Sequence, residues 1–402
     1  MKKLIAAILA LCLVFTGFIS YKDHGGSAFA ESKTEQTEQT EQTEQETETV
    51  QAPSVALDFD ALYAAHAPED VIMDVNGELI TWNDYYFYLY MQANQMASNL
   101  QQMAAYYGVS YGWEDVIDDD GTTVSALTTA NSVEMFRQYM AIEKLAEQKG
   151  ISLTDEQLAA VSERIEADVK AACGDDGTVE QFAELLAKEH ISPADFEHAY
   201  KVSMLYTAAQ NELYGENGSK LSDEDAMKFM EDYGYLCATH ILFATIDTST
   251  REPRDEAAAA EKKAKAEEVS AQLRAITDEK ELVETFAKLK EELCDDTGKV
   301  AYPDGYVFMP GEMVPEFENA VASAENYKVT EPVESSYGYH VIMRLPLDVD
   351  MVMGANSDGS AITGRSTAAG VMYADELQAV DDSIEIVYKN GYVAPKLDKF
   401  VK

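Results

Sequence analysis

The chain has 402 residues, which is too long for one ordinary domain and suits two or three domains with buried cores. Its 73 acidic residues outnumber the 30 Lys and Arg, giving a formal net charge of -43 at pH 7. Such a surface repels phosphate backbones and anionic membrane faces, which argues against nucleic acid as a partner.

Residues 1–30 have the three parts of a secretory signal peptide. A basic start, Met1-Lys2-Lys3, precedes an apolar run, and Ala28-Phe29-Ala30 offers small residues for cleavage. Because the apolar run is short for a bilayer, we expect a secreted or extracytoplasmic protein with no membrane span in the mature chain. A lipid anchor on Cys12 is the weaker alternative, since Leu11 is bulkier than the small residue usual there. Association with the cell envelope is left open.

Residues 31–54 repeat Thr-Glu-Gln and have nothing to bury, which predicts a disordered acidic tether. A tight hairpin should follow over 71–80, because Asn76-Gly77 supplies the positive φ angles of such a turn. Thr81 can cap the next helix. We expect some of that helix's aromatic residues in a core and others exposed: Trp82, Tyr85, Tyr86, Phe87, Tyr88 and Tyr90.

Helix signals continue to about residue 234. Gly150 should end one helix, and Thr154 with Gln157 should form a capping box at the start of the next. Ser192-Pro193 and Ser222 should begin two more. Residues 55–234 therefore read as a mainly helical domain. Beyond Pro346, we predict a loop over 354–370, a helix over 373–380 and a strand over 383–388.

Three cysteines remain after the signal peptide, Cys173, Cys237 and Cys294. An odd number at such wide spacing does not make a disulfide framework. We assign them no chemistry.

Two histidine signatures frame a segment of about a hundred residues. Thr239-His240-Ile241-Leu242-Phe243 opens it, Tyr337-Gly338-Tyr339-His340-Val341-Ile342 closes it, and residues 303–318 lie between with the sequence Pro-Asp-Gly-Tyr-Val-Phe-Met-Pro-Gly-Glu-Met-Val-Pro-Glu-Phe-Glu. This order resembles a parvulin-type peptidyl-prolyl cis-trans isomerase domain, here over 235–346.

The passage Val75-Asn76-Gly77-Glu78-Leu79-Ile80-Thr81, with the helices after it, resembles the chaperone region of PrsA-like and SurA-like secretory foldases. That family implies an α+β fold. A helical chaperone domain is completed by a returning C-terminal segment, 347–402, and the parvulin-like domain is an antiparallel sheet surrounded by helices.

Isomerising an Xaa-Pro bond breaks no covalent bond, so the reaction needs no nucleophile, metal or cofactor. The obstacle is a barrier of roughly 18–20 kcal/mol from the partial double bond of the amide. An enzyme must bind the twisted amide better than either planar isomer. It therefore needs an apolar recess for the proline ring and polar groups beside the amide.

By resemblance, Met313 and Phe317 fall on the proline-pocket positions, and their spacing predicts one helical face. Phe308 is expected to contribute to the wall. His240 and His340 correspond to the paired histidines of the parvulin site, joined by a hydrogen bond, and their direct role stays open.

The family's helix and loop deliver an acidic residue, or in some members a cysteine, to the site. Asp296 falls at that position, with Asp295 as the competing assignment and Cys294 as a weaker one. The alternative for each of these residues, taken alone, is a solvated turn or ordinary packing.

Three positions depart from the family pattern. Gly305 stands where many parvulins carry an apolar pocket residue, which predicts a wider recess or more dependence on Phe308. Tyr337 replaces a small hydroxyl residue near the second histidine, a change expected to reshape the hydrogen-bond network there. Arg251 and Arg254 do not form a dense basic cluster, so an unphosphorylated Xaa-Pro segment fits better than a phosphorylated one.

The sequence therefore predicts a secreted foldase that isomerises Xaa-Pro bonds in unfolded exported proteins, with chaperone activity in the helical domain. A holdase with an inactive or dispensable parvulin domain is the alternative. An envelope adhesion or scaffold protein is a third interpretation that no sequence feature favours. A homodimer is left open.

Overall fold

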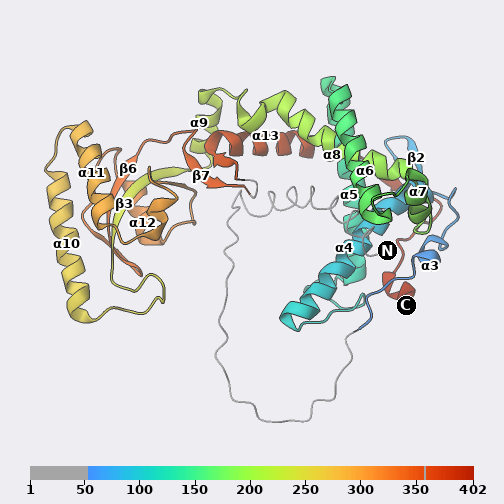
Figure 1. Ribbon diagram of the computed structural model, residues 1–402, viewed down its shortest axis with the longest axis horizontal. Coiled ribbons are helices and arrows are strands. Elements are labelled where there is room, and N and C mark those ends of the chain that lie inside the picture. Colours follow the sequence, from blue (N-terminus) through green and yellow to red (C-terminus); the bar gives the residue numbers. More distant parts are fainter. Residues whose placement is uncertain (1–52, 357–358) are drawn as a thin grey trace, which may run out of the picture. The chain divides into compact units, whose positions relative to one another are not determined.

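The computed structural model describes residues 53–356 and 359–402, which form two compact units (Figure 1). The first contains the described residues up to Leu213 together with Val371–Lys402, and the second is Tyr214–Gly370. The predicted signal peptide and all but the last two residues of the predicted tether lie outside the described residues. No helix of the described chain combines the length and apolar character needed to cross a membrane.

The first unit is mainly helical. Its helices are α3 (Phe59–Tyr63), α4 (Trp82–Tyr107), α5 (Val124–Lys149), α6 (Asp155–Cys173), α7 (Val179–Ala187) and α8 (Pro193–Tyr214). The predicted caps are confirmed: Thr81 and Thr154 each close a capping box, and Gly150 ends α5 in the left-handed conformation. Local sequence therefore sets these helix ends, because each cap satisfies amide or carbonyl groups that the helix leaves unpaired.

The six aromatic residues named above, which lie in the first half of α4, are all buried, so the prediction that some of them would be exposed is wrong. Rings from three other elements surround them, namely Tyr63 of α3, Phe136 of α5 and Tyr392 of the C-terminal segment. A helix covered on several sides needs apolar residues on several faces. The exposed aromatics lie instead at its far end, at Tyr106 and Tyr107.

The C-terminal segment returns to the first unit. Strands β1 (Val71–Val75) and β2 (Glu78–Thr81) form the predicted hairpin, and β9 (Ile386–Tyr388) adds to it in the order β2-β1-β9. Helix α13 (Gly364–Asp381) is tied to α5 where Arg137 meets Asp381 at 2.7 Å. These contacts join residues about 240 to 315 positions apart in sequence.

The predicted loop over 354–370 is wrong. Strands β7 (Val352–Ala355) and β8 (Ala361–Thr363) pair there, and α13 begins at Gly364. Thr363 and Ser366 exchange side-chain and backbone hydrogen bonds of 2.9 and 3.1 Å. This reciprocal cap starts the helix inside a stretch whose Gly and Ser content suggested a loop.

The second unit contains a four-stranded antiparallel sheet in the order β4-β3-β6-β5. Its strands are β3 (Leu236–Ala244), β4 (Tyr306–Phe308), β5 (Val333–Ser335) and β6 (Gly338–Leu345). Helices α10 (Glu256–Arg274) and α11 (Glu279–Leu293) supply one core cluster with the sheet, and α12 (Pro315–Ser323) supplies another. The chain is therefore α+β, with a helical unit and a helix-covered antiparallel sheet.

This unit extends past 235–346 at both ends, taking in α9 (Asp223–Asp232) and the β7-β8 hairpin. Arg365 joins the added pieces, since it pairs with Asp223 at 2.5 Å and Asp350 at 2.7 Å. It also donates to the carbonyl of Leu221 at 2.8 Å. Three segments distant in sequence thus meet at one guanidinium.

Replacing Arg137 should destabilise the first unit. Arg137→Met leaves the buried carboxylate of Asp381 without its arginine, at a cost of about 3 kcal/mol. Both tryptophans of the chain, Trp82 and Trp113, are buried in this unit, so tryptophan fluorescence during urea unfolding reports on it selectively.

The matched control is Glu134→Gln, which removes the more exposed partner of the same arginine. It should change the unfolding free energy by no more than about 0.5 kcal/mol. An Arg137→Met midpoint equal to that of the unsubstituted protein would contradict the importance of the long-range pair.

Candidate active site

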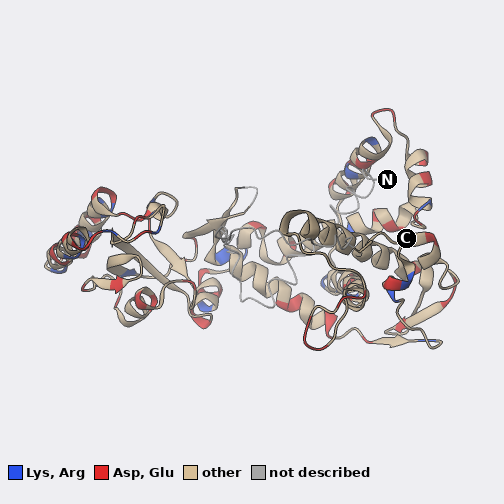
Figure 2. Cartoon of the chain, turned by 90° about the horizontal axis from the view of Figure 1, so that it is seen from below, with Lys and Arg blue, Asp and Glu red and all other residues tan. Residues whose placement is uncertain are grey.

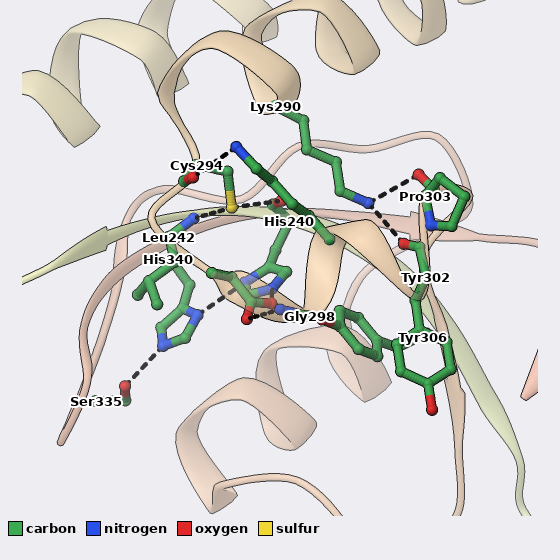
Figure 3. Close-up of polar contacts among 12 residues, drawn as sticks. His240, Leu242, Lys290, Cys294, Gly298, Tyr302, Pro303, Tyr306, Ser335 and His340 are labelled. Atoms are coloured by element: carbon green, nitrogen blue, oxygen red, sulfur yellow. Dashed lines mark hydrogen bonds and ion pairs between the residues drawn. The ribbon is translucent and has the colours of Figure 1, made fainter. Parts of the chain in front are cut away.

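The two signature histidines lie on the two central strands of the sheet. His240 of β3 is opposite Ile342, and His340 of β6 is opposite Leu242, so the two side chains are diagonal neighbours on one face. Their Nδ1 atoms are 3.0 Å apart and both side chains are buried (Figure 3). The hydrogen bond that the resemblance implied is therefore present.

Asp296 reaches this pair from the loop after α11. Its Oδ2 lies 2.9 Å from His240 Nε2, and its Oδ1 accepts the backbone N–H of Gly298 at 2.9 Å. Burial alone would raise the pKa of Asp296, but hydrogen bonds from His240, Tyr306 and Gly298 outweigh it and hold that pKa well below its usual range. The carboxylate stays charged and remains about a quarter exposed.

The two competing residues face elsewhere. Asp295 Oδ2 accepts the backbone N–H of Ala244 at 2.9 Å and pairs with Lys262. Cys294 accepts the N–H of Leu242 at 3.3 Å, and burial raises the pKa of its thiol. Both residues fasten the loop to β3, which leaves Asp296 as the member that meets the histidines.

An apolar cluster adjoins the imidazoles. Phe308 of β4 and Phe317 of α12 are buried, with ring centroids 5.8 Å apart, and Met313 packs half-buried against the same cluster. The Phe317 ring packs against both imidazoles in edge-to-face contacts. Its centroid lies 5.2 Å from that of His240 and 5.5 Å from that of His340. The apolar and polar parts of the candidate site are in direct contact.

Met313 and Phe317 do not share a helical face, so that prediction is wrong. Helix α12 begins at Pro315, and Val314 before it has an extended conformation with ψ 139°. A proline disfavours helical geometry in the residue that precedes it, so the helix cannot extend back to Met313. Met313 reaches the cluster from the loop.

Two polar residues of the site were missed in the sequence. Tyr306 donates to Asp296 Oδ2 at 2.6 Å, and Ser335 lies 2.7 Å from His340 Nε2 (Figure 3). Tyr306 is two positions before Phe308 on one strand, and this period of two could have identified it. Tyr337, expected to change this network, lies at the surface and contributes its backbone N–H to Ser335.

The loop before β4 has little freedom. A Cβ at Gly305 would lie 2.6 Å from the carbonyl oxygen of Ala238, so the close approach of the two backbones leaves no room for a side chain there. Buried Lys290 donates to the carbonyls of Tyr302 and Pro303 at 3.1 and 2.9 Å. Burial lowers the pKa of Lys290. Together these contacts position the strand that carries Tyr306.

Within residues 53–356 and 359–402, no group of three or more His, Cys, Asp or Glu is arranged to hold a metal ion. The site consists of the Asp296 carboxylate, the two imidazoles, the hydroxyl groups of Tyr306 and Ser335, and the apolar cluster. Such a set can bind and polarise a substrate.

Comparisons with known proteins point to the same segment. Residues 240–345 match the family model of the rotamase PPIC-type PPIase domain. The foldase protein PrsA of Geobacillus kaustophilus is 29% identical over 198 residues, covering 48% of this chain and 56% of that protein. PrsA of Halalkalibacterium halodurans is 42% identical over 69 residues, 17% of this chain and 21% of that one.

The chaperone SurA of Burkholderia orbicola is 32% identical over 113 residues, which is 27% of this chain and 25% of that protein. These matches span between about a fifth and just over half of the relatives' own lengths. The family model covers most of the sheet, the histidine pair, Asp296 and most of the apolar cluster described above. Residues 240–345 are therefore a PPIC-type peptidyl-prolyl isomerase domain of the parvulin class, in a chain related to the PrsA and SurA foldases.

Proposed function

We propose that this protein is an extracytoplasmic foldase that isomerises Xaa-Pro bonds in unfolded exported proteins, while its helical unit binds those clients. The observation that carries the proposal is the charged Asp296 beside a buried histidine pair and an apolar cluster. Relatives named foldase PrsA and chaperone SurA support it. The signal-peptide pattern at the N-terminus supports export.

The proposed role of Asp296 follows from the electronic structure of an amide. A planar amide places negative charge on its carbonyl oxygen by resonance, and twisting about the C–N bond withdraws that charge. A carboxylate near the carbonyl oxygen therefore destabilises the planar isomers relative to the twisted state. Because Asp296 is ionised and partly exposed, it is the group suited to this role.

The cluster of Phe308, Met313 and Phe317 is the proposed recess for the proline ring, and it supplies the binding half of the reaction. Phe317 and Phe308 form a rigid aromatic surface, and half-buried Met313 forms a flexible edge. A proline ring held there keeps one side of the amide fixed while the other side rotates. In this arrangement the recess determines the preference for proline, and Asp296 acts on the bond before it.

The histidine pair has one proton arrangement that satisfies every contact with both rings neutral. His240 Nε2–H donates to Asp296, so its Nδ1 accepts the Nδ1–H of His340, and His340 Nε2 accepts the hydroxyl of Ser335. Burial, assisted by His240, lowers the pKa of His340 to about 3, which keeps that ring neutral. We assign the pair to positioning Asp296.

Removing the carboxylate should abolish most isomerase activity. With a short Xaa-Pro peptide as substrate, we expect Asp296→Ala to lower kcat/KM by roughly 10- to 100-fold. Met313→Ala should lower it less, mainly by weakening peptide binding. Asp304→Asn is the matched control, because Asp304 is an exposed carboxylate on the nearby loop, and its activity should be unchanged.

Circular dichroism would show that each variant is folded. Full activity in folded Asp296→Ala would contradict the proposed role of the carboxylate. An inactive unsubstituted protein that still suppresses client aggregation would favour a holdase instead.

His340 should remain neutral at mildly acidic pH. In two-bond proton–nitrogen NMR spectra assigned with His340→Gln, its ring should keep the neutral Nδ1–H pattern at pH 5, because its pKa is lowered to about 3. His198 is an internal control, since its hydrogen bond with Glu143 raises its pKa and it should take up its proton first. An imidazolium pattern for His340 at pH 6 would contradict this arrangement.

The same shift has a consequence for stability. An unfolded chain protonates this histidine near pH 6.5, whereas the folded chain does so only near pH 3. Between those values the unfolded state binds more protons, so the second unit should lose stability as the pH falls.

A further inference from the structure

A groove in the first unit lies outside the isomerase domain. Its volume is about 370 Å³, and it is bordered by β2, α4, α5 and α8, which are labelled in Figure 1. All of its lining residues belong to one compact unit. Neither the histidine pair nor the recess contributes to it.

The floor of the groove is apolar and aromatic. Phe87 and Tyr88 of α4 and Phe136 of α5 line it, and the rings of Tyr88 and Phe136 are nearly perpendicular with centroids 5.1 Å apart. Tyr88 is only 6% exposed, and its hydroxyl has no hydrogen-bond partner among the described residues. A hydroxyl that opens on a groove without a protein partner is free to bond to a ligand there.

The rim of the groove is acidic. Four carboxylates line it, and no Lys or Arg occurs among its described lining residues: the carboxylates are Glu78, Asp84, Glu143 and Asp195. Asp84 and Asp195 also cap helices, while Glu143 bonds to His198 at 2.8 Å. Glu78 has no partner within the described part of the chain, and exposed Leu79 stands next to it.

We propose that this groove binds an extended segment of an unfolded protein in which Lys or Arg adjoins a large apolar side chain. The apolar side chain packs on the Phe87–Phe136 floor, the cation meets Glu78 and Glu143, and a backbone group bonds to the Tyr88 hydroxyl. This inference rests on the proposed function, since it names the clients that the helical unit would hold.

Charge complementarity selects this occupant over two others. The chain's own segment 31–50 is rich in Glu, so it would be repelled by the rim. A second copy carries a net charge of -43, and acidic side chains are spread over both units (Figure 2). A basic, apolar segment is the complementary partner, and the long-range field of the chain would attract it.

The test is fluorescence anisotropy with the full chain and a short labelled peptide of Lys, Leu, Phe, Ser and Gly. The peptide lacks proline, so it avoids the proposed isomerase reaction. We expect Glu78→Gln/Glu143→Gln to weaken binding roughly three- to tenfold and to reduce its salt dependence. Tyr88→Phe, which removes only the hydroxyl, should weaken binding roughly fivefold. The same peptide with Glu in place of Lys should bind far more weakly.

The matched control is Glu163→Gln/Glu166→Gln, which removes two exposed charges on α6 away from the groove. Unchanged binding in the groove variant, or an equal loss in the control, would overturn the proposal. So would a dimer of the unsubstituted protein that the groove substitutions dissociate, because the groove would then serve a second copy.

Prolyl isomerisation measured on the same variants separates this inference from the proposed function. We expect the groove variants to retain activity on a short Xaa-Pro peptide. An inactive isomerase with intact peptide binding would contradict the proposed enzyme and leave the groove assignment standing.

Discussion

The hydrogen bond between His240 and His340 is the contact around which the candidate site is organised. It exists because β3 and β6 pair in a register that places the two rings diagonally on one face of the sheet. A slip of one residue would turn one ring to the opposite face. Asp296, Ser335 and the Phe317 ring each contact this pair, so strand register fixes the polar and apolar halves together.

Two opposing effects act on the pKa of Asp296: burial raises it, and hydrogen bonds lower it by more. Its pKa is held down by donors from an imidazole, a phenol and a backbone amide and by charge interaction with His240, with no Lys or Arg among the causes. These interactions keep the carboxylate ionised, and no Lys or Arg among the described residues pairs with it. A substrate amide would therefore meet a negative potential, which is what the proposed chemistry requires.

Features set by neighbouring residues were predictable from the sequence, and features set by tertiary contacts were not. Capping boxes at Thr81 and Thr154 depend on side chains three positions away, and both are present. The full burial of the aromatic residues between Trp82 and Tyr90 depends on α3, α5 and Tyr392, which no local pattern reveals. For the site, the resemblance brought His240, His340 and Asp296 together correctly, but Ser335 joins only through strand pairing and Met313 lies before the helix because of Pro315.

Binding of a proline ring beside Met313 is the central claim, and NMR of the methionine methyl groups tests it most directly. With methionine methyl groups labelled with ¹³C, addition of a short Xaa-Pro peptide should shift the Met313 resonance, assigned by substitution among the 16 methionines of the chain. The same peptide with Ala in place of Pro should leave that resonance in place. A Met313 signal that is unmoved by the proline peptide, or moved equally by both peptides, would contradict the assignment of this recess to the proline ring.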